Sequence, residues 1–374
     1  MTREYIVPGR VEFVGKHVDY AGGRSLTCAI EAAIHATATP IAEPVLRVSD
    51  GRRRDVVSAR LAAEGPARGN TRGAYAAAVA RRLARDFPRA QRGVEVMLRS
   101  NLPASAGLSS SSAMVVALAM SLVDANDLDN DAAWRAAVPT PMARAEYFAA
   151  METGAPYGAF GGDEGVGVRG GAQDHVAIVC AREGEVGQFR YLPARAERFV
   201  AFPDECLIAI AVSGVHAAKR GNARAAYNQL SDAMRGFAVS GFPDDPPREL
   251  AERVAQFREE TDVIVPGVAD ALSNRDFGAL GALVDRSQWL AERVLGNQVR
   301  ETVFLARSAR ENGALAASAF GAGFGGAVWA LVLRDDATRF VAGWRARYES
   351  AFPSRRARAR WILTGAAGPA RRSS

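Results

Sequence analysis

The sequence predicts a protein of two domains, each built from both strands and helices. The chain has 374 residues, which is enough for two domains of ordinary size. Alternating segments typical of strands, such as residues 94–98, stand between apolar or amphipathic segments typical of helices. The composition shifts over residues 194–203. We therefore expect one domain over residues 1–200 and a second over residues 201–374.

The composition narrows the class of protein. The chain is 48% hydrophobic and 24% charged, which is typical of a soluble globular protein. Its net charge of +6 comes largely from arginine-rich segments near the C-terminus, and no basic patch is interleaved with aromatic residues. Three widely spaced cysteines argue against a disulfide framework or a zinc site. Neither a signal peptide nor a membrane span stands out. We expect a cytoplasmic protein with no nucleic-acid or membrane partner.

The stretch around residues 94–124 carries the strongest chemical signal. A strand over residues 94–98 leads to Pro103, Gly107 and four serines, and an apolar helix follows over residues 113–123. Serine is a favoured helix N-cap, and the first N–H groups of a helix have no partner inside it. With the positive end of the helix dipole they form a site for phosphate. A serine-rich cap on a core helix would explain one or two of these serines, but not the whole pattern.

The N-terminal stretch combines two strand pieces with a polar loop. Residues 5–7 and 11–14 read as strands around Pro8-Gly9-Arg10, and Lys16, His17 and Asp19 follow before an apolar segment over residues 26–34. From chemistry alone, a charged surface hairpin and a ligand site explain this loop equally well. A hairpin around Asp50-Gly51 follows over residues 45–57, and then a helix over residues 74–85 whose arginines we expect to face solvent.

A helix and a long glycine-rich loop follow the serines. The helix covers about residues 141–151 and contains Glu146, and the loop covers residues 154–171. Because the loop exceeds the usual connection length, we expect it to be functional or mobile. Asp174 comes next, before a segment over residues 176–180 that we expect to be a strand. An Asp at this place suits catalysis, although an Asx-turn at a strand start is the simpler alternative.

The second half alternates between apolar strands and amphipathic helices. We expect a strand over residues 207–212, helices over residues 219–234, 248–260, 269–275 and 277–293, and a final strand over residues 360–364. A glycine loop over residues 320–326 leads into a strand that ends near residue 332. We expect this loop to pack near the serines and the basic tail to be disordered.

Three segments resemble the motifs of the GHMP kinases, the superfamily of galactokinase, homoserine kinase and mevalonate kinase. Residues 103–112 are similar to the phosphate loop P-x-x-x-G-L-[GS]-S-S-[AS], and the glycine loop resembles the galactokinase segment G-G-G-F-G-G-C. The run P-G-R-V-E-F-V-G-K-H-V-D-Y-A-G-G resembles the galactokinase signature P-G-R-V-N-L-I-G-E-H-T-D-Y-N-G-G. Glu12 replaces the Asn of that signature, which we interpret as structural, and Lys16 replaces its Glu. The implied fold is the α+β, two-domain GHMP kinase fold, with a ribosomal-protein-S5-like N-terminal domain and a ferredoxin-like C-terminal domain.

The resemblance implies an ATP-dependent kinase that phosphorylates the anomeric hydroxyl of a monosaccharide, as a monomer or homodimer. Phosphoryl transfer depends on positioning and charge neutralisation. The implied catalytic residues are Asp174, which accepts or orients the hydroxyl proton, and Arg10, which stabilises charge on the transferred phosphate. Mg²⁺ would be held by Ser111 and Glu146. ATP would be held by Pro103, Gly107, Leu108, Ser109, Ser110, Ser111 and Ser112, and the sugar by Lys16, His17, Asp19, Gly171 and Tyr227.

Three alternatives to a kinase of neutral sugars stay open at this point: a uronic-acid kinase, a mevalonate- or homoserine-type kinase, and a non-catalytic sugar sensor. An ammonium at Lys16 cannot accept a hydrogen bond and would favour an anionic sugar, so a galacturonate or glucuronate 1-kinase is one of them. If Lys16 instead turns outward or pairs with Glu12 or Asp163, a plain hexose or pentose remains the substrate. The H-x-D-Y-x-G-G motif speaks against a mevalonate- or homoserine-type kinase. Retention of Arg10, Glu146 and Asp174 speaks against a non-catalytic sugar sensor.

Overall fold

The first of two sheets is built almost entirely from the N-terminal half of the chain. The computed structural model describes residues 1–51, 53–65, 71–103, 106–168, 170–215 and 222–373, without side-chain detail for residues 53–54 and 222–230. The sheet has the order β12-β1-β2-β5-β3-β4, with β6 paired to β2 and β7 to β6. Its strands are β1 (Arg3–Val14), β2 (Arg24–Ile41), β3 (Val45–Asp50), β4 (Arg53–Arg60), β5 (Gly93–Ser100), β6 (Glu185–Arg190), β7 (Arg195–Ala201) and β12 (Arg371–Arg372). The expected hairpin around Asp50-Gly51 is confirmed as β3 and β4.

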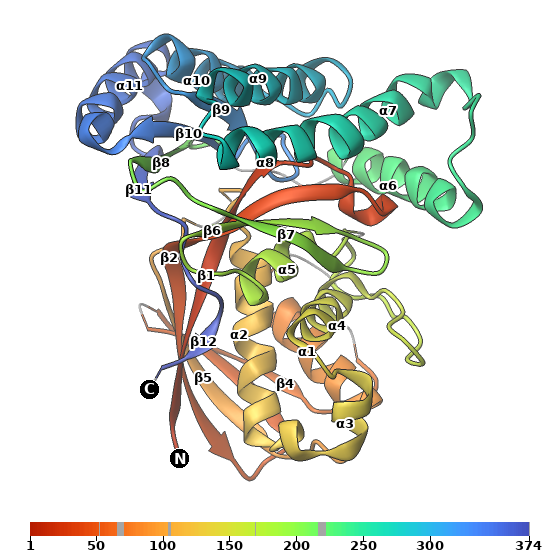
Figure 1. Ribbon diagram of the computed structural model, residues 1–374. Helices are drawn as coiled ribbons and strands as arrows, with labels where there is room; N and C mark the ends of the chain where they lie inside the picture. The colour runs from red at the N-terminus through yellow and green to blue at the C-terminus, as the bar shows by residue number, and fades with distance from the viewer. Residues whose placement is uncertain (52, 66–70, 104–105, 169, 216–221, 374) are drawn as a thin grey trace.

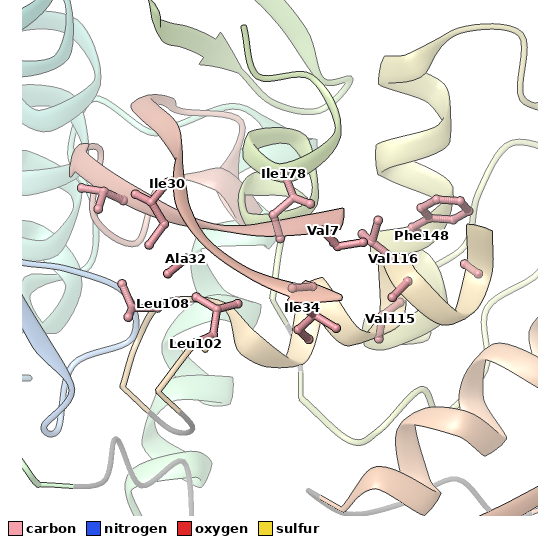
Figure 2. Close-up of a cluster of buried hydrophobic side chains, with 14 of the residues drawn as sticks. Val7, Ile30, Ala32, Ile34, Leu102, Leu108, Val115, Val116, Phe148 and Ile178 are labelled. Carbon is pink, nitrogen blue, oxygen red and sulfur yellow. The ribbon is translucent and has the colours of Figure 1, made fainter. Parts of the chain in front are cut away.

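Helices pack against this sheet and bury its apolar residues. They are α1 (Arg72–Asp86), α2 (Ser110–Ala125), α3 (Ala132–Ala137), α4 (Pro141–Thr153) and α5 (Gln173–Val179), with α2 running along the sheet between the other helices and the strands (Figure 1). Val7 and Ile34 of the strands meet Val115 and Val116 of α2, Phe148 of α4 and Ile178 of α5 (Figure 2). Leu102 and Leu108, on either side of the turn before α2, insert into the same cluster (Figure 2). The core therefore anchors both ends of the loop that precedes α2.

The second sheet is formed by the C-terminal half and is antiparallel throughout. Its order is β11-β8-β10-β9, from β8 (Cys206–Val212), β9 (Ala316–Ala319), β10 (Ala327–Leu333) and β11 (Arg360–Thr364). The helices of this half are α6 (Asn222–Ser240), α7 (Arg248–Glu259), α8 (Val265–Ser273), α9 (Phe277–Arg293), α10 (Arg300–Glu311) and α11 (Ala337–Ala351), with a π-helical segment, η3 (Glu260–Ile264), joining α7 to α8. α9, α10 and α11 lie together at one end of the molecule, while α6 and α7 extend to the side (Figure 1). No helix in the described part of the chain is long and apolar enough to cross a membrane.

The end of the chain returns to the first sheet, so the expectation of a disordered basic tail is wrong. Strand β12 pairs antiparallel with β1, with Arg372 opposite Tyr5 and Arg371 opposite Ile6. The edge of a sheet presents unpaired N–H and C=O groups, and these residues satisfy part of the β1 edge. The division at residue 200 stays a prediction, and the last residues lie with the N-terminal half.

The segment after Asp174 is a helix, where we expected a strand. Residues 173–179 form α5, which buries Val176 and Ile178 against the core. A short apolar run fits a buried strand and a buried helix equally well, and its packing decides between them. The helix has a direct consequence for the site, because Asp174 lies in its first turn.

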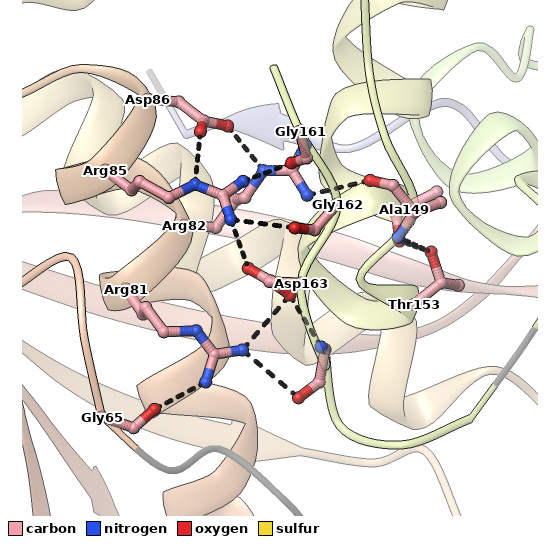
Figure 3. A network of polar contacts seen from close by, with 12 residues as sticks. Gly65, Arg81, Arg82, Arg85, Asp86, Ala149, Thr153, Gly161, Gly162 and Asp163 are labelled. Carbon is pink, nitrogen blue, oxygen red and sulfur yellow. Dashed lines mark hydrogen bonds and ion pairs between the residues drawn. The ribbon is translucent and has the colours of Figure 1, made fainter.

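Arg81 and Arg82 of α1 are buried, contrary to the expectation of a solvated face, while Arg85 is partly exposed. Arg82 Nε donates to Asp86 Oδ2 at 2.5 Å, and Arg81 Nη2 to Asp163 Oδ1 at 3.2 Å (Figure 3). Arg82 donates to the backbone carbonyl of Ala155 in the glycine-rich loop. Arg85 donates to the carbonyl of Gly161 in the same loop (Figure 3). Buried charged groups need such partners. These contacts fasten the loop of residues 154–171 to α1.

Candidate active site

A small pocket gathers most of the residues that the sequence indicated as sugar-binding. It has a volume of about 70 Å³ and lies between β1, the loop after β1, the end of the glycine-rich loop, α5 and the loop after β9. Its lining residues are Arg10, Glu12, His17, Asp19, Gly170, Gly171, Gln173, Asp174, Gly321 and Ala322. Arg10, His17, Asp19, Gly171 and Asp174 thus come together from segments up to 164 positions apart.

Arg10 connects this pocket to the phosphate loop. Its Nε and Nη2 bind Asp174 Oδ1 at 2.9 and 2.7 Å, while Nη1 donates to the carbonyl of Gly107 at 2.6 Å. Arg10 is 3% exposed, so its planar guanidinium holds one geometry. Asp174 Oδ2 lies 3.5 Å from Ser112 Oγ at the start of α2. Asp174 therefore stands between the small pocket and the serines.

Close packing fixes Asp19 against the loop before α5. Its Oδ2 accepts a hydrogen bond from the backbone N–H of Gln173 at 3.3 Å. A Cβ at Gly171 would lie 2.3 Å from that same oxygen, so only glycine fits there. Burial, reinforced by the nearby charge of Asp174, raises the pKa of Asp19. On the other side of the loop, His17 Nε2 contacts the Ala322 carbonyl at 3.3 Å.

Glu12 is a pocket residue that the sequence analysis assigned to structure alone. It is 3% exposed, and its Oε2 accepts a hydrogen bond from the N–H of Gly321 at 3.3 Å. Its Oε1 has no hydrogen-bond partner among the described residues. Burial raises the pKa of Glu12 to about 7, against the opposing effects of Arg10 and Lys16. An acidic residue inside an apolar strand, Val11-Glu12-Phe13, is the signal that could have indicated this role.

Lys16 does not line the pocket, which corrects its assignment to sugar binding. It is 1% exposed, and its Nζ donates to Ser287 Oγ at 2.6 Å. Ser287 in turn donates to Glu260 Oε1 at 2.7 Å, so the serine bridges ammonium and carboxylate. Burial lowers the pKa of Lys16, and Glu260 opposes that shift. The partner acid is thus neither Glu12 nor Asp163.

Tyr227 lies on α6, in the stretch whose side chains are outside the described residues. Its expected contact with the sugar stays a prediction.

The phosphate loop turns sharply into α2. Gly107 and Ser109 have φ angles of 78° and 58°, and the first helical bond runs from Ala113 N–H to the Ser109 carbonyl at 2.8 Å. The N–H groups of Ser110, Ser111 and Ser112 therefore have no acceptor within the helix. Ser109 makes no side-chain cap, contrary to the expected role of a capping serine, because its left-handed backbone directs the side chain elsewhere. These groups are placed to bind an anion.

The glycine loop packs against the phosphate loop, as expected from the sequence. A Cβ at Gly321 would lie 3.3 Å from the Gly107 carbonyl oxygen, and one at Gly326 would lie 3.2 Å from that of Ala106. Both glycines have positive φ angles, 73° and 87°. Their small size lets the two loops approach closely.

A larger cleft of about 1020 Å³ opens beside the serines. Pro103, Ser110, Ser111 and Tyr75 line one side. Arg358, Arg360 and Trp361 line the other, next to the second sheet. A volume of this size suits a nucleotide. Of the expected phosphate-binding residues, Ser110, Ser111 and Pro103 therefore face a cleft, whereas Ser109, Ser112 and Leu108 are buried and Gly107 contacts Arg10.

Glu152, and not Glu146, is the carboxylate beside the serines. Glu146 Oε1 accepts a hydrogen bond from the N–H of Ala194 at 2.7 Å, about 9 Å along α4 from Glu152. Glu152 Oε2 accepts from Ser112 Oγ at 2.9 Å and lies 3.2 Å from His175 Nε2. Both acids stand on the same helix, which begins at the Thr140 cap and ends at Gly154. The A-x-R-x-E context pointed to the wrong one, because sequence alone does not show which turn of α4 meets α2.

Glu152 and Ser112 fit the binding of one divalent cation whose other ligands are water and phosphate oxygens. No group of three or more His, Cys, Asp or Glu side chains gathers as a metal site within the described residues. Mg²⁺ prefers oxygen ligands, retains several waters and uses one or two carboxylates plus phosphate oxygens. Glu152 and Ser112 supply one carboxylate and one hydroxyl at the mouth of an anion site.

Three family models match separate segments of the chain. The N-terminal domain of GHMP kinases matches residues 74–182, and the GHMP kinase C-terminal domain matches residues 268–350. The galactokinase galactose-binding signature matches residues 4–40. These segments include the phosphate loop, Glu152, Asp174 and β1.

Similar proteins and structures agree with these matches. The galactokinase of Chloroflexus aurantiacus is 28% identical over 91% of this chain and 86% of its own, and that of Thermococcus kodakarensis is 29% identical over 87% and 88%. The structure of Lactococcus lactis galactokinase complexed with galactose has a TM-score of 0.82 at 17% identity, covering 99% of this chain and 95% of its own. The Methanococcus jannaschii mevalonate kinase has a TM-score of 0.64 at 14% identity, covering 98% of each chain. The chain belongs to the GHMP kinase superfamily and carries its galactokinase signature.

Proposed function

We propose that this protein is an ATP-dependent kinase that phosphorylates the anomeric hydroxyl of a monosaccharide. The observation that carries the proposal is the chain of contacts from Asp174 through Arg10 to the Gly107 carbonyl. These contacts connect two sites. One is the small pocket, whose donors and acceptors suit sugar hydroxyls, and the other is the loop before α2, which suits phosphates. A kinase needs its two substrates held at such a junction.

Each part of the junction has a role in phosphoryl transfer. The N–H groups at the start of α2 bind the phosphates of ATP, and Arg10 stabilises charge between the sugar oxygen and the γ-phosphate. Asp174 accepts or orients the proton of the attacking hydroxyl. Glu152 and Ser112 would hold Mg²⁺, which neutralises phosphate charge when it is bound. His17, Asp19 and Gly171 hold the sugar. Action as a monomer or homodimer in the cytoplasm is also part of this proposal.

The uronic-acid alternative loses its support. It rested on Lys16, whose ammonium binds Ser287 behind the pocket. The pocket itself is lined by three acidic residues, Glu12, Asp19 and Asp174, and a carboxylated sugar would be repelled by them. A non-catalytic sensor would need neither the Arg10–Asp174 pair nor the link to the phosphate loop.

The test is turnover with a panel of sugars. ADP release should require Mg²⁺, ATP and a monosaccharide together. The Asp174→Asn variant serves as the matched control, because Asn keeps the shape and cannot accept the proton. Absence of ADP release with every sugar, together with absence of nucleotide binding in calorimetry, would refute the proposal.

A further inference from the structure

The sugar pocket is lined by three acidic side chains, Glu12, Asp19 and Asp174, and by one arginine, Arg10. Of the acids that line it, Asp174 is bound by Arg10, the one cation among the lining residues. Glu12 and Asp19 form no ion pair with a described residue. Two further cations act on these acids through space, Lys16 on Glu12 and Arg235 on Asp19. Their hydrogen bonds go elsewhere: Lys16 donates to Ser287, and Arg235 Nη2 donates to the Gly170 carbonyl at 2.8 Å.

Glu12 stands out within this pocket because one of its oxygens has no partner. Oε2 is bound by the N–H of Gly321, while Oε1 is buried and without a hydrogen bond among the described residues. A buried carboxylate oxygen left unsatisfied is costly unless a donor reaches it. The Gln173 side chain donates a hydrogen bond to the Glu12 carboxyl and lowers its pKa, yet burial dominates and the pKa is raised. Because Glu12 lines the pocket, a bound ligand can supply the donor that Oε1 lacks.

We propose that Glu12 contacts the substrate and gives this pocket a preference for a monosaccharide that carries an amino group. This inference rests on the proposed sugar-kinase function. An ammonium group has three donors and a positive charge, so it satisfies Glu12 Oε1 and forms a charge-assisted hydrogen bond with that carboxylate. A neutral hydroxyl satisfies the hydrogen bond without offsetting the charge. The galactokinase signature has Asn at this position, so the preference belongs to this chain.

The preference can be measured on the whole protein with paired sugars. We compare kcat/KM for galactosamine, glucosamine and mannosamine with kcat/KM for the parent hexose of each, at pH 7. In the wild-type protein we expect at least one amino sugar to exceed its neutral parent. In Glu12→Gln we expect that ratio to fall by about tenfold or more, because a charged hydrogen bond is replaced by a neutral one. Glu4→Gln is the matched control, an exposed glutamate on the same strand, and should leave the ratio unchanged.

Several outcomes would overturn the inference. One is a wild-type protein that prefers every neutral sugar, a result that needs no variant and holds even if Glu12→Gln does not fold. Another is a Glu12→Gln variant that keeps the wild-type ratio, or that loses kcat equally with both kinds of sugar. Failure of the proposed function would look different, since then the wild-type protein would phosphorylate none of the sugars.

Discussion

Replacing Lys16 with Met should destabilise the protein and leave its choice of sugar unchanged. Lys16 and Glu260 are 1% and 0% exposed, and Ser287 bridges them. Removing the ammonium leaves a buried carboxylate without its balancing charge, and breaking such a pair costs about 3–5 kcal/mol. Glu260 Oε1 still accepts from the N–H groups of Gly15 and Lys16, at 2.7 and 3.3 Å. We therefore expect the lower end of that range.

The assay combines unfolding with substrate ranking. A loss of about 3 kcal/mol corresponds to a decrease of roughly 4 °C in melting temperature for a chain of this length. The double variant Lys16→Met/Glu260→Gln should recover much of the loss, since it removes both charges, and the double-mutant cycle gives their coupling. The kcat/KM ranking of galactose over galacturonate should be the same in wild type and variant.

Two results would refute this reasoning. If Lys16→Met is as stable as the wild type, the Lys16 ammonium does not balance the charge of the Glu260 carboxylate. If the variant changes the ratio of galacturonate to galactose, Lys16 reaches the substrate and its place behind the pocket is wrong.

The remaining predictions concern the site itself. Asp174→Asn should lower kcat at least about 100-fold with ATP affinity unchanged in calorimetry; if most of kcat remains, Asp19 becomes the candidate base. Glu152→Gln should raise the Mg²⁺ concentration for half-maximal activity at least about tenfold, whereas Glu146→Gln should leave it unchanged, and equal effects would contradict the assignment. Burial raises the pKa of Glu12 from 4.5 to about 7 in the folded state. The unfolded state therefore loses this proton first, and the wild-type protein loses stability as the pH rises from 4.5 through 7. Urea titrations should show the free energy of unfolding of Glu12→Gln rising, relative to that of the wild type, by up to about 3 kcal/mol between pH 4.5 and 8. If the difference between the two free energies is the same at both pH values, the raised pKa of Glu12 is contradicted.

The sequence indicated local structure and motif residues well, because both depend on nearby residues. The phosphate loop stands at the start of α2, and Arg10 meets Asp174 across 164 positions. Motif residues converge in this way because one function constrains them all. The turn at Asp50-Gly51 was equally predictable from its dipeptide.

The errors share one physical cause, which is that long-range partners decide them. Lys16 turns toward Ser287, and no pattern near residue 16 announces a partner 271 positions away. Arg82 is buried because the glycine-rich loop covers it and supplies the Ala155 carbonyl, while Asp86 of the same helix balances its charge. Glu146 and Glu152 differ only in which turn of α4 meets α2, and a helix pattern shows no such choice. The tail pairs with β1 because the edge of that strand is open to it.

The most direct test of the proposed activity is the position of the phosphate on the product. Incubation with ATP, Mg²⁺ and the best sugar of the panel, followed by phosphorus NMR, should show one new phosphate ester on the anomeric carbon and one ADP for each ester formed. Asp174→Asn should give neither. A phosphate on any other hydroxyl, or ATP binding with no transfer to any monosaccharide, would contradict the assignment of this protein as a sugar 1-kinase.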